Sequence, residues 1–187
     1  MIESILIYLI QSLSGFFAGA LLLRFWLQRC RAPQHNPLST FIQALTNKLV
    51  IPCRRWIPGL WGFDWSSLLL SLLVIIVEAF LCALIRDRGV EMAFSTLLLL
   101  ALVMWIRLAL YLAIGLIFML AILSWMNPSS PFMAVTTLLT RPLLQPLQKI
   151  LPPVGQVDLS PMVALLLLQL IAMGPLAYLE RWLGLFF

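Results

Sequence analysis

Long apolar runs separated by short polar stretches dominate the chain. Three of these runs, 5–27, 67–85 and 159–179, contain few charged residues. Each has roughly the 20-residue length that a helix needs to cross the apolar core of a bilayer. We therefore predict a membrane-spanning α-helix from each run.

The run from 92 to 126 is too long for a single span. As a straight helix its roughly 35 residues would extend about 52 Å, whereas the hydrocarbon core is about 30 Å thick. Arg107 divides the run, and we predict a span over 108–125. The preceding segment, 92–106, is either an interfacial or re-entrant helix or the protruding start of one long helix. We count four spans, and a fifth stays open.

Two connections between spans are amphipathic. Within 37–60 and within 131–153, apolar residues recur at helical spacing with polar residues between them. We predict short amphipathic helices that lie at the membrane surface, called here the first cap and the second cap. Prolines are expected to cut both connections into pieces too short to span. These prolines are Pro37, Pro52, Pro58, Pro128, Pro131, Pro142, Pro146, Pro152 and Pro153.

The two halves of the chain repeat one another. The segment LTNKLVIPCRRWIPGLWGFDWS, which begins at Leu45, returns as LTRPLLQPLQKILPPVGQVDLS, which begins at Leu139. An Asn-Pro pair precedes each copy, and an Asp-x-Ser sequence closes it. This pattern indicates duplication, so we predict two repeats, 1–90 and 91–187. The expected fold is an all-α membrane protein of duplicated transmembrane hairpins, each with an interfacial helix between its spans.

Composition and charge indicate an integral membrane protein with a defined orientation in the bilayer. The chain is 63% hydrophobic and 10% charged, with a mean hydropathy of +1.05, whereas about a quarter of the residues in a soluble domain are charged. Most bases behind the net charge of +5 flank the caps. By the positive-inside rule, we predict caps in the cytoplasm and both termini in the periplasm. The bases would meet anionic lipid head groups, and nucleic acid is not indicated.

Asp64 and Asp158 open the second and fourth spans. They could form a pair of carboxylates, related by the repeat, that binds a cation or carries protons. Alternatively, each caps the helix that follows, because a carboxylate accepts hydrogen bonds from free backbone amides and suits the positive end of a helix. We favour capping.

Glu78 and Arg107 are intramembrane charges, which are costly and usually mark function or a partner. If 92–106 runs straight, they lie at different depths, roughly 16 Å and 26 Å along their helices. Glu78 would then be protonated and bonded to a neighbouring helix, or would face another subunit. Arg107 alone is typical of an interface anchor.

Arg54 and Arg55 lie between Pro52 and Pro58. Their guanidinium groups could bind a lipid phosphate or an acidic partner. Orientation of the chain by positive charge is the simpler interpretation, and we favour it.

The chain contains few of the residues that catalytic, metal or cofactor sites require. The chain has three cysteines without metal-ligand spacing and a single histidine, His35. It has no Gly-rich phosphate loop, and a haem with two histidine ligands from this chain alone is excluded, although one axial ligand is not. We predict a protein that is not an enzyme and holds no metal or cofactor.

The repeated strings resemble the YggT family of small bacterial membrane proteins. The first copy has LLLRFWLQ, then Asn-Pro-Leu-Ser, IPCRRWIPG and a span that begins with aspartate; the second has ILSWMNP, LTRPLLQPLQKILP and VDLSPMVALLLLQL. The second copy lacks an equivalent of Arg24 and has Arg141 in place of Asn47. The motif or interface candidates are Arg24, Asn36, Pro37, Pro52, Arg54, Arg55, Pro58, Asp64, Asn127, Pro128, Pro146, Lys149, Pro152 and Asp158.

The resemblance implies a role in osmotic tolerance, ion homeostasis or envelope assembly, and plastid relatives imply haem attachment to a cytochrome. Our leading hypothesis is a non-enzymatic inner-membrane protein whose cytoplasmic caps dock a protein partner, a second copy of the chain or lipid head groups. The alternatives are a small oligomeric channel or transporter for cations, and an assembly factor for a membrane cofactor protein.

Overall fold

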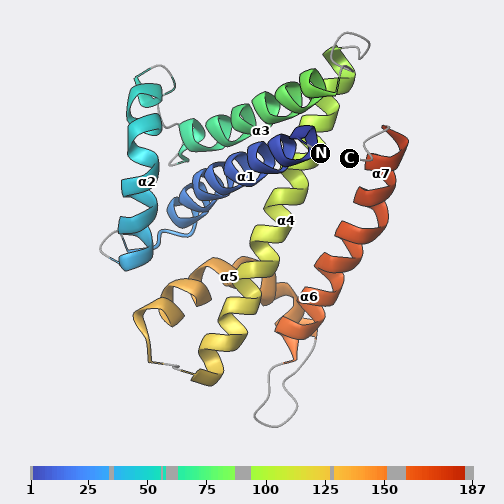
Figure 1. Cartoon of the computed structure of the whole chain (residues 1–187). Helices are drawn as coiled ribbons and strands as arrows, with labels where there is room; N and C mark the ends of the chain where they lie inside the picture. The colour runs from blue at the N-terminus through green and yellow to red at the C-terminus, as the bar shows by residue number, and fades with distance from the viewer. Residues whose placement is uncertain are drawn as a thin grey trace.

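The protein is helical throughout the part of the chain that the computed structural model describes, which is residues 2–33, 36–55, 57, 63–86, 94–126, 129–150 and 159–183 (Figure 1). These residues contain no strand. The helices are α1 (Ile2–Arg29), α2 (Pro37–Arg54), α3 (Trp65–Ile85), α4 (Phe94–Met126), α5 (Pro131–Ile150), α6 (Ser160–Ile171) and α7 (Ala177–Trp182), with one turn of π-helix, η1 (Ala172–Leu176), joining the last two.

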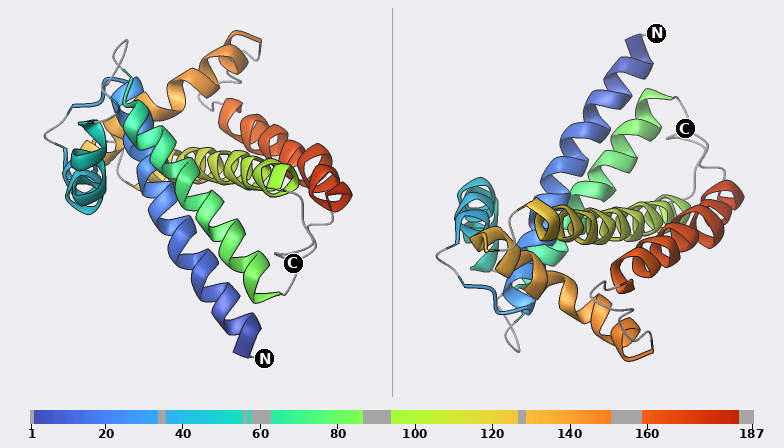
Figure 2. Two further views of the ribbon diagram at one scale, coloured as in Figure 1. Left: turned by 90° about the horizontal axis from the view of Figure 1, so that it is seen from above. Right: turned by 90° about the horizontal axis from the view of Figure 1, so that it is seen from below.

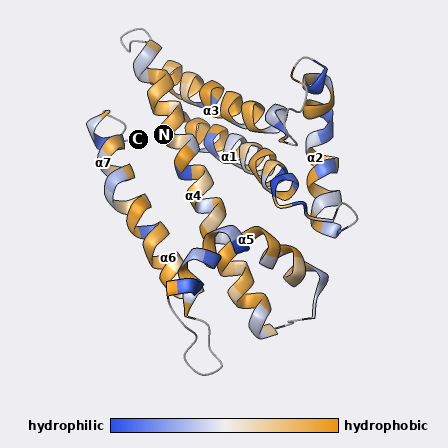
Figure 3. Ribbon diagram, turned by 180° about the vertical axis from the view of Figure 1, so that it is seen from behind, coloured by the Kyte–Doolittle hydropathy of each residue, from blue (hydrophilic) through white to orange (hydrophobic). Residues whose placement is uncertain are grey.

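Four helices among the described residues are long and apolar enough to cross a membrane: α1, α3, α4 and the combined Ser160–Trp182 helix. The all-α membrane fold predicted from the apolar runs is therefore confirmed. Of the alternatives for 92–106, the structure shows the long helix, because α4 continues unbroken over 33 residues. Apolar residues cover these helices, and hydrophilic ones gather at α2, α5 and the adjoining helix ends (Figure 3).

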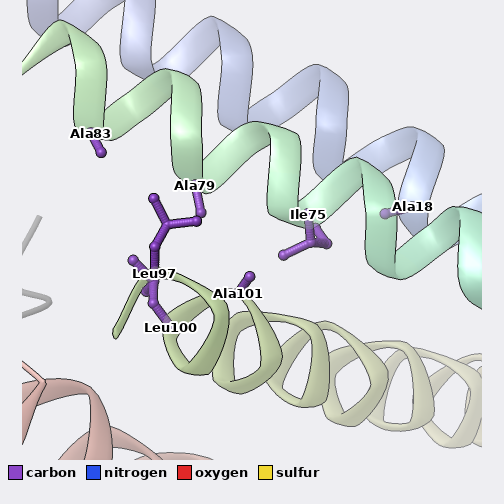
Figure 4. Packing of buried hydrophobic residues seen from close by; sticks show 7 residues of the cluster. All are labelled: Ala18, Ile75, Ala79, Ala83, Leu97, Leu100 and Ala101. Atoms are coloured by element: carbon purple, nitrogen blue, oxygen red, sulfur yellow. The ribbon is translucent and has the colours of Figure 1, made fainter. Parts of the chain in front are cut away.

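The helices pair as two hairpins that meet at α4. Helices α1 and α3 lie side by side, α4 packs with the α6–α7 helix, and the first hairpin crosses α4 steeply (Figure 2). At the crossing, Ala79 and Ala83 of α3 pack against Leu97, Leu100 and Ala101 of α4 (Figure 4). Small residues let the helix backbones approach closely, which is how membrane helices associate without a hydrophobic driving force.

Pro37 and Pro131 stand at the starts of the cap helices, but Pro52, Pro142 and Pro146 do not divide the caps as predicted. The first cap is the single helix α2, which contains Pro52, and the second cap is the single helix α5, which contains Pro142 and Pro146. All three prolines lie on exposed positions. A carbonyl that loses its partner to proline there can bond to water or head groups, so each helix continues through its prolines.

The two caps lie at the same end of the hairpins and share one core. Ile42 of α2 and Val135 and Leu139 of α5 belong to one buried cluster. The indole nitrogen of Trp26 in α1 donates a hydrogen bond to the carbonyl of Leu139 at 3.1 Å. The two caps are therefore linked through a buried cluster that also includes residues of α1 and α4.

Helix α1 ends in an arginine with a left-handed backbone. Arg31 has φ of 52°. Its amide donates to the Gln28 carbonyl at 3.0 Å, and the Ala32 amide donates to the Leu27 carbonyl at 3.0 Å. This is the Schellman ending, in which glycine is the usual left-handed residue because it has no Cβ to clash. The arginine therefore carries backbone strain of about 1 kcal/mol.

Arg31→Gly is expected to stabilise the protein by about 1 kcal/mol, because glycine adopts this backbone without strain. The measurement is the unfolding midpoint in detergent micelles. Arg29→Gly, two residues earlier and still in the helix, is the matched control and should lower stability by about the same amount. An Arg31→Gly protein no more stable than the wild type would contradict this account of the helix end.

Candidate functional site at the junction of α1, α2 and α3

Asn36 fixes the start of α2. It occupies the N-cap position, where its side-chain oxygen accepts a hydrogen bond from the Ser39 amide at 2.8 Å, and Pro37 follows in the first turn. Its side-chain nitrogen donates to the Ser39 hydroxyl at 2.8 Å and to the Pro33 carbonyl. Asparagine at the N-cap followed by proline suits the first turn of a helix, where free amides need acceptors and proline loses nothing.

Asp64 is the centre of the junction, and its side chain is only 1% exposed. Arg54, at the end of α2, places its Nη2 2.6 Å from Oδ2 of Asp64 and its Nε 3.4 Å from Oδ1. The Ser67 hydroxyl donates to the same Oδ2 at 2.8 Å. The carboxylate thus ties the last turn of the first cap to the start of α3.

Arg24 joins α1 to the same centre. Its Nε lies 3.4 Å from Oδ2 of Asp64. Its Nη1 donates to the Thr46 hydroxyl at 2.7 Å and to the Asn47 side-chain oxygen at 2.8 Å, both on α2. Because the Arg24 side chain is only 10% exposed, this pair is shielded from water and breaking it leaves a buried charge.

The predicted capping role of Asp64 is wrong for its side chain. Asp64 does occupy the N-cap position of α3, but its side chain makes no capping hydrogen bond. Only its backbone carbonyl bonds into the helix, accepting from Ser67 and Leu68. The carboxylate binds the two guanidinium groups instead of the backbone amides, because hydrogen bonds between opposite charges are about twice as strong as those between neutral groups.

The surroundings of Asp64 favour its charged form. Burial by itself raises the pKa of the Asp64 carboxyl group. The hydrogen bonds from Arg54 and Ser67 and the charges of Arg54 and Arg24 outweigh that effect, so the pKa lies below its ordinary value. The carboxylate is thus engaged as an anion by two arginines, which leaves it little charge with which to attract a cation.

A cavity of about 610 Å³ opens between the end of α1 and the inner face of α2. Arg24, Arg31 and Arg54 line it, together with the side-chain amides of Gln28 and Gln43. Its volume falls within the range of ligand-binding pockets, about 300 to 1,000 Å³. Among the described residues, no carboxylate lines this cavity.

The intramembrane charges do not pair with each other. Arg107 Nη1 lies 2.7 Å from Oε2 of Glu180, which is in α7, so this ion pair ties α4 to the last helix. Glu78 is 4% exposed, and its Oε2 has no hydrogen-bond partner in the described part of the chain. With 94–126 forming a straight helix, the different depths predicted for Glu78 and Arg107 explain why they do not meet.

The second repeat lacks this junction as far as it is described. Thr140, which matches Thr46, donates to the Thr136 carbonyl at 2.8 Å, and no described arginine donates to it. Arg141, Pro146 and Lys149 lie on exposed positions of α5. The remaining candidates fall outside the described residues: Pro58, Asn127, Pro128, Pro152 and Asp158.

The sequence interpretation missed the partners that complete the site. The amphipathic pattern treats Thr46 and Gln43 only as polar positions, Asn47 stands out only as a difference between the repeats, and nothing in the sequence assigns Arg31 or Gln28 to a site. A buried arginine near the end of a span needs hydrogen-bond acceptors. The position of Arg24 in the sequence could therefore have predicted that polar residues of the next helix face it.

Comparison with known proteins decides the family. The profile of the family described as CCB3/YggT matches residues 3–85 and 99–179. The chain belongs to this family. The two matched segments correspond to the two tandem repeats, and each includes one cap and the spans beside it.

Several bacterial relatives share most of the chain. An uncharacterised protein of Pseudomonas aeruginosa is 37% identical over 169 residues, which cover 89% of this chain and 86% of the relative. The uncharacterised protein YggT of Escherichia coli is 31% identical over 177 residues, which cover 90% and 88%. An uncharacterised protein encoded in the proC 3′ region of Vibrio alginolyticus is 32% identical over 163 residues, which cover 87% and 88%. No solved structure matches the chain significantly.

Asp64→Asn is expected to lower the free energy of unfolding by about 3 kcal/mol, because it leaves the buried Arg24 without its counter-charge. Arg54→Gln is the comparison and should cost no more than about 1 kcal/mol, because the Arg54 side chain is 45% exposed. Denaturant unfolding in detergent micelles measures both. Equal and small effects would contradict the central position assigned to Asp64.

The contribution of Asp64 should depend on pH. Its pKa in the folded protein lies below its value in the unfolded chain, about 3.9. The stabilisation is therefore fully present above about pH 4 and is lost as the pH falls through the folded-state pKa. Measured from pH 7 down to pH 3, the stability difference between the wild type and Asp64→Asn should shrink. A difference that stays constant over this range would argue against an ionised Asp64.

Proposed function

We propose that this protein is a non-enzymatic component of the bacterial inner membrane whose two caps form a cytoplasmic docking surface for an acidic protein partner. Its physiological role would lie in osmotic tolerance, ion homeostasis or envelope assembly. The observation that carries the proposal is the joint, cationic surface of the caps, which the two repeats build together.

The charge of the cap surface supports an acidic partner. At the cap end, the carboxylate of Asp64 is buried beneath two arginines, whereas the cations lie on exposed positions of the described chain. These cations are Arg29, Arg31, Lys48, Arg54, Arg55, Arg141 and Lys149. A surface of one sign attracts partners of the opposite sign and increases their association rate.

The outer face of α2 also exposes apolar area. Phe41 is 58% exposed and Leu49 is 44% exposed, and both belong to the apolar residues that recur at helical spacing in the first cap. The buried side instead includes Ser39 and Thr46, because Asn36 and Arg24 need polar partners there. Exposed apolar residues beside cations can bind either a partner helix or the bilayer surface.

Phe41, Lys48 and Arg55 follow one another at intervals of seven residues, which is about two helical turns. They therefore form one stripe on the outer face of the first cap. Lys48 and Arg55 have no ion-pair partner among the described residues. They can be reversed in charge without breaking the Asp64 junction, which makes them better test positions than Arg54.

The double variant Lys48→Glu/Arg55→Glu is expected to lose docking but keep its fold and membrane level. A photo-crosslinking residue at Phe41 should capture a protein in cells, and the double variant should reduce that capture about tenfold. The same residue at Leu73, which is 55% exposed in the middle of α3, is the matched control and should capture lipid instead.

A deletion strain provides the functional readout. Wild-type protein should restore its growth after osmotic upshift, whereas the double variant should not. Unchanged capture and full rescue by the double variant would contradict docking through this stripe. A separate labelling experiment tests the proposed topology. A thiol reagent confined to the periplasm should label a cysteine placed at Ile2 and should not label cysteines in the caps.

A second candidate function is cation passage through an oligomer, and Glu78 is the observation that favours it. A buried carboxylate with an unpartnered oxygen in the described structure is the type of group that carries protons or cations within membranes. Reconstituted protein should then show a potassium, sodium or proton flux that Glu78→Gln abolishes. Vesicles without such flux would eliminate this candidate.

A further inference from the structure

The cavity between α1 and α2 lies on the opposite face of α2 from the docking stripe. Ser39, Gln43 and Asn47 follow each other at intervals of four residues and line it. The stripe of Phe41, Lys48 and Arg55 is not part of the lining. The cavity is thus separate from the stripe, although it shares Arg31 and Arg54 with the cationic cap surface.

The cavity offers hydrogen-bond donors that the protein does not use. Arg24 has five N–H groups, and its Nε and Nη1 groups face Asp64, Thr46 and Asn47. The two hydrogens of its Nη2 have no partner in the described structure. Arg54 directs Nε and Nη2 to Asp64, and its Nη1 has no partner among the described residues.

Arg31 adds a complete guanidinium group to this set. It lines the cavity, and its guanidinium group makes no hydrogen bond or ion pair with any described residue. Its backbone has the left-handed φ of 52° that follows the end of α1. A strained arginine whose side chain has no partner in the described part of the chain is the arrangement expected of a residue that meets a ligand.

The excess positive charge at the cavity favours an anionic ligand. Arg24, Arg31 and Arg54 carry three positive charges, and the buried Asp64 compensates one of them, which leaves an excess of two at the cavity. Guanidinium groups bind phosphate oxygens in pairs of parallel hydrogen bonds. The amides of Gln28 and Gln43 add neutral donors and acceptors suited to hydroxyl groups.

The apolar part of the lining favours a lipid as the source of the phosphate. Leu27, Ile42 and Ile51 line the cavity beside the arginines, and Ile51 is 55% exposed. The cavity lies where the span α1 ends and the amphipathic α2 begins, which is the level of the head groups. A soluble phosphate would gain nothing from these apolar contacts, whereas the glycerol and upper acyl carbons of a phospholipid would.

We propose that this cavity binds the head-group phosphate of an anionic phospholipid. Arg24, Arg31 and Arg54 hold the phosphate, Gln28 and Gln43 bond to the polar head, and the apolar lining contacts the start of the acyl chains. Asp64 positions two of the three arginines and does not touch the lipid.

Native mass spectrometry of the full chain in detergent, titrated with phosphatidylglycerol or phosphatidylcholine, tests the proposal. The wild type should prefer phosphatidylglycerol. Gln43→Glu, which puts a carboxylate into the cavity, and Arg31→Gly, which removes the free guanidinium, should each weaken binding of phosphatidylglycerol about tenfold. Arg31→Gly should do so without loss of thermal stability, so lost binding cannot be attributed to unfolding.

Two control variants separate this site from the rest of the surface. Arg29→Ala removes an exposed arginine that does not line the cavity, and Lys48→Glu reverses a charge on the outer face of α2. Both should bind phosphatidylglycerol as the wild type does. Conversely, Gln43→Glu should leave photo-crosslinking from Phe41 unchanged, so failure of lipid binding and failure of docking are distinguishable.

Inorganic phosphate and glycerol phosphate distinguish the two sources of the ligand. At millimolar concentration, neither should displace phosphatidylglycerol. Displacement of the lipid by glycerol phosphate, with the same sensitivity to Gln43→Glu, would assign the cavity to a soluble phosphate and overturn the lipid proposal. Equal binding of both lipids by the wild type, or losses as large in the two control variants, would also overturn it.

Discussion

The structure of the first repeat depends on the buried carboxylate of Asp64, which binds two arginines. Asp64 is almost completely buried, and it receives Arg54 from the end of α2 and Arg24 from within α1. A guanidinium near the end of a membrane span is costly unless its donors are satisfied. Placing α2 across the end of the hairpin gives partners to the Nη1 group, because it brings Thr46 and Asn47 to Arg24. The need of Arg24 for hydrogen-bond partners therefore explains the position of the first cap.

The same constraint creates the functional chemistry of this end of the molecule. Two arginines held by one carboxylate leave a positive excess and unused donors, and the strained end of α1 adds Arg31. Thr140 in the second repeat bonds to the carbonyl four residues earlier, as Thr46 does in the first, but no described arginine donates to it. The described parts of the two repeats thus share an amphipathic cap helix and differ in its polar contacts, and both caps contribute to one buried cluster.

Much of the fold followed from the sequence because its signals are local. Apolar run length predicted the spans, the repeated string predicted two similar units, and amphipathic spacing predicted the caps. The prediction that prolines end the cap helices failed at Pro52, Pro142 and Pro146, because the effect of a proline depends on its exposure. These three lie on exposed positions, where a freed carbonyl can find another partner. The site was harder to predict, because the partners of Asp64 come from α1 and α2 and helix capping was the nearest local explanation. Nothing in the sequence around Arg31 indicated its left-handed backbone, since glycine is the residue expected there.

The central claim is that Arg24 and Asp64 stabilise the protein through each other. A double-mutant cycle measures this directly, with Arg24→Gln, Asp64→Asn and the double variant unfolded by denaturant in the same micelles. The account predicts strongly non-additive losses, with a coupling free energy of about 2 kcal/mol, because a buried charge without its partner is costlier than the absence of both. Additive losses would show that the two residues act independently, and would contradict the account.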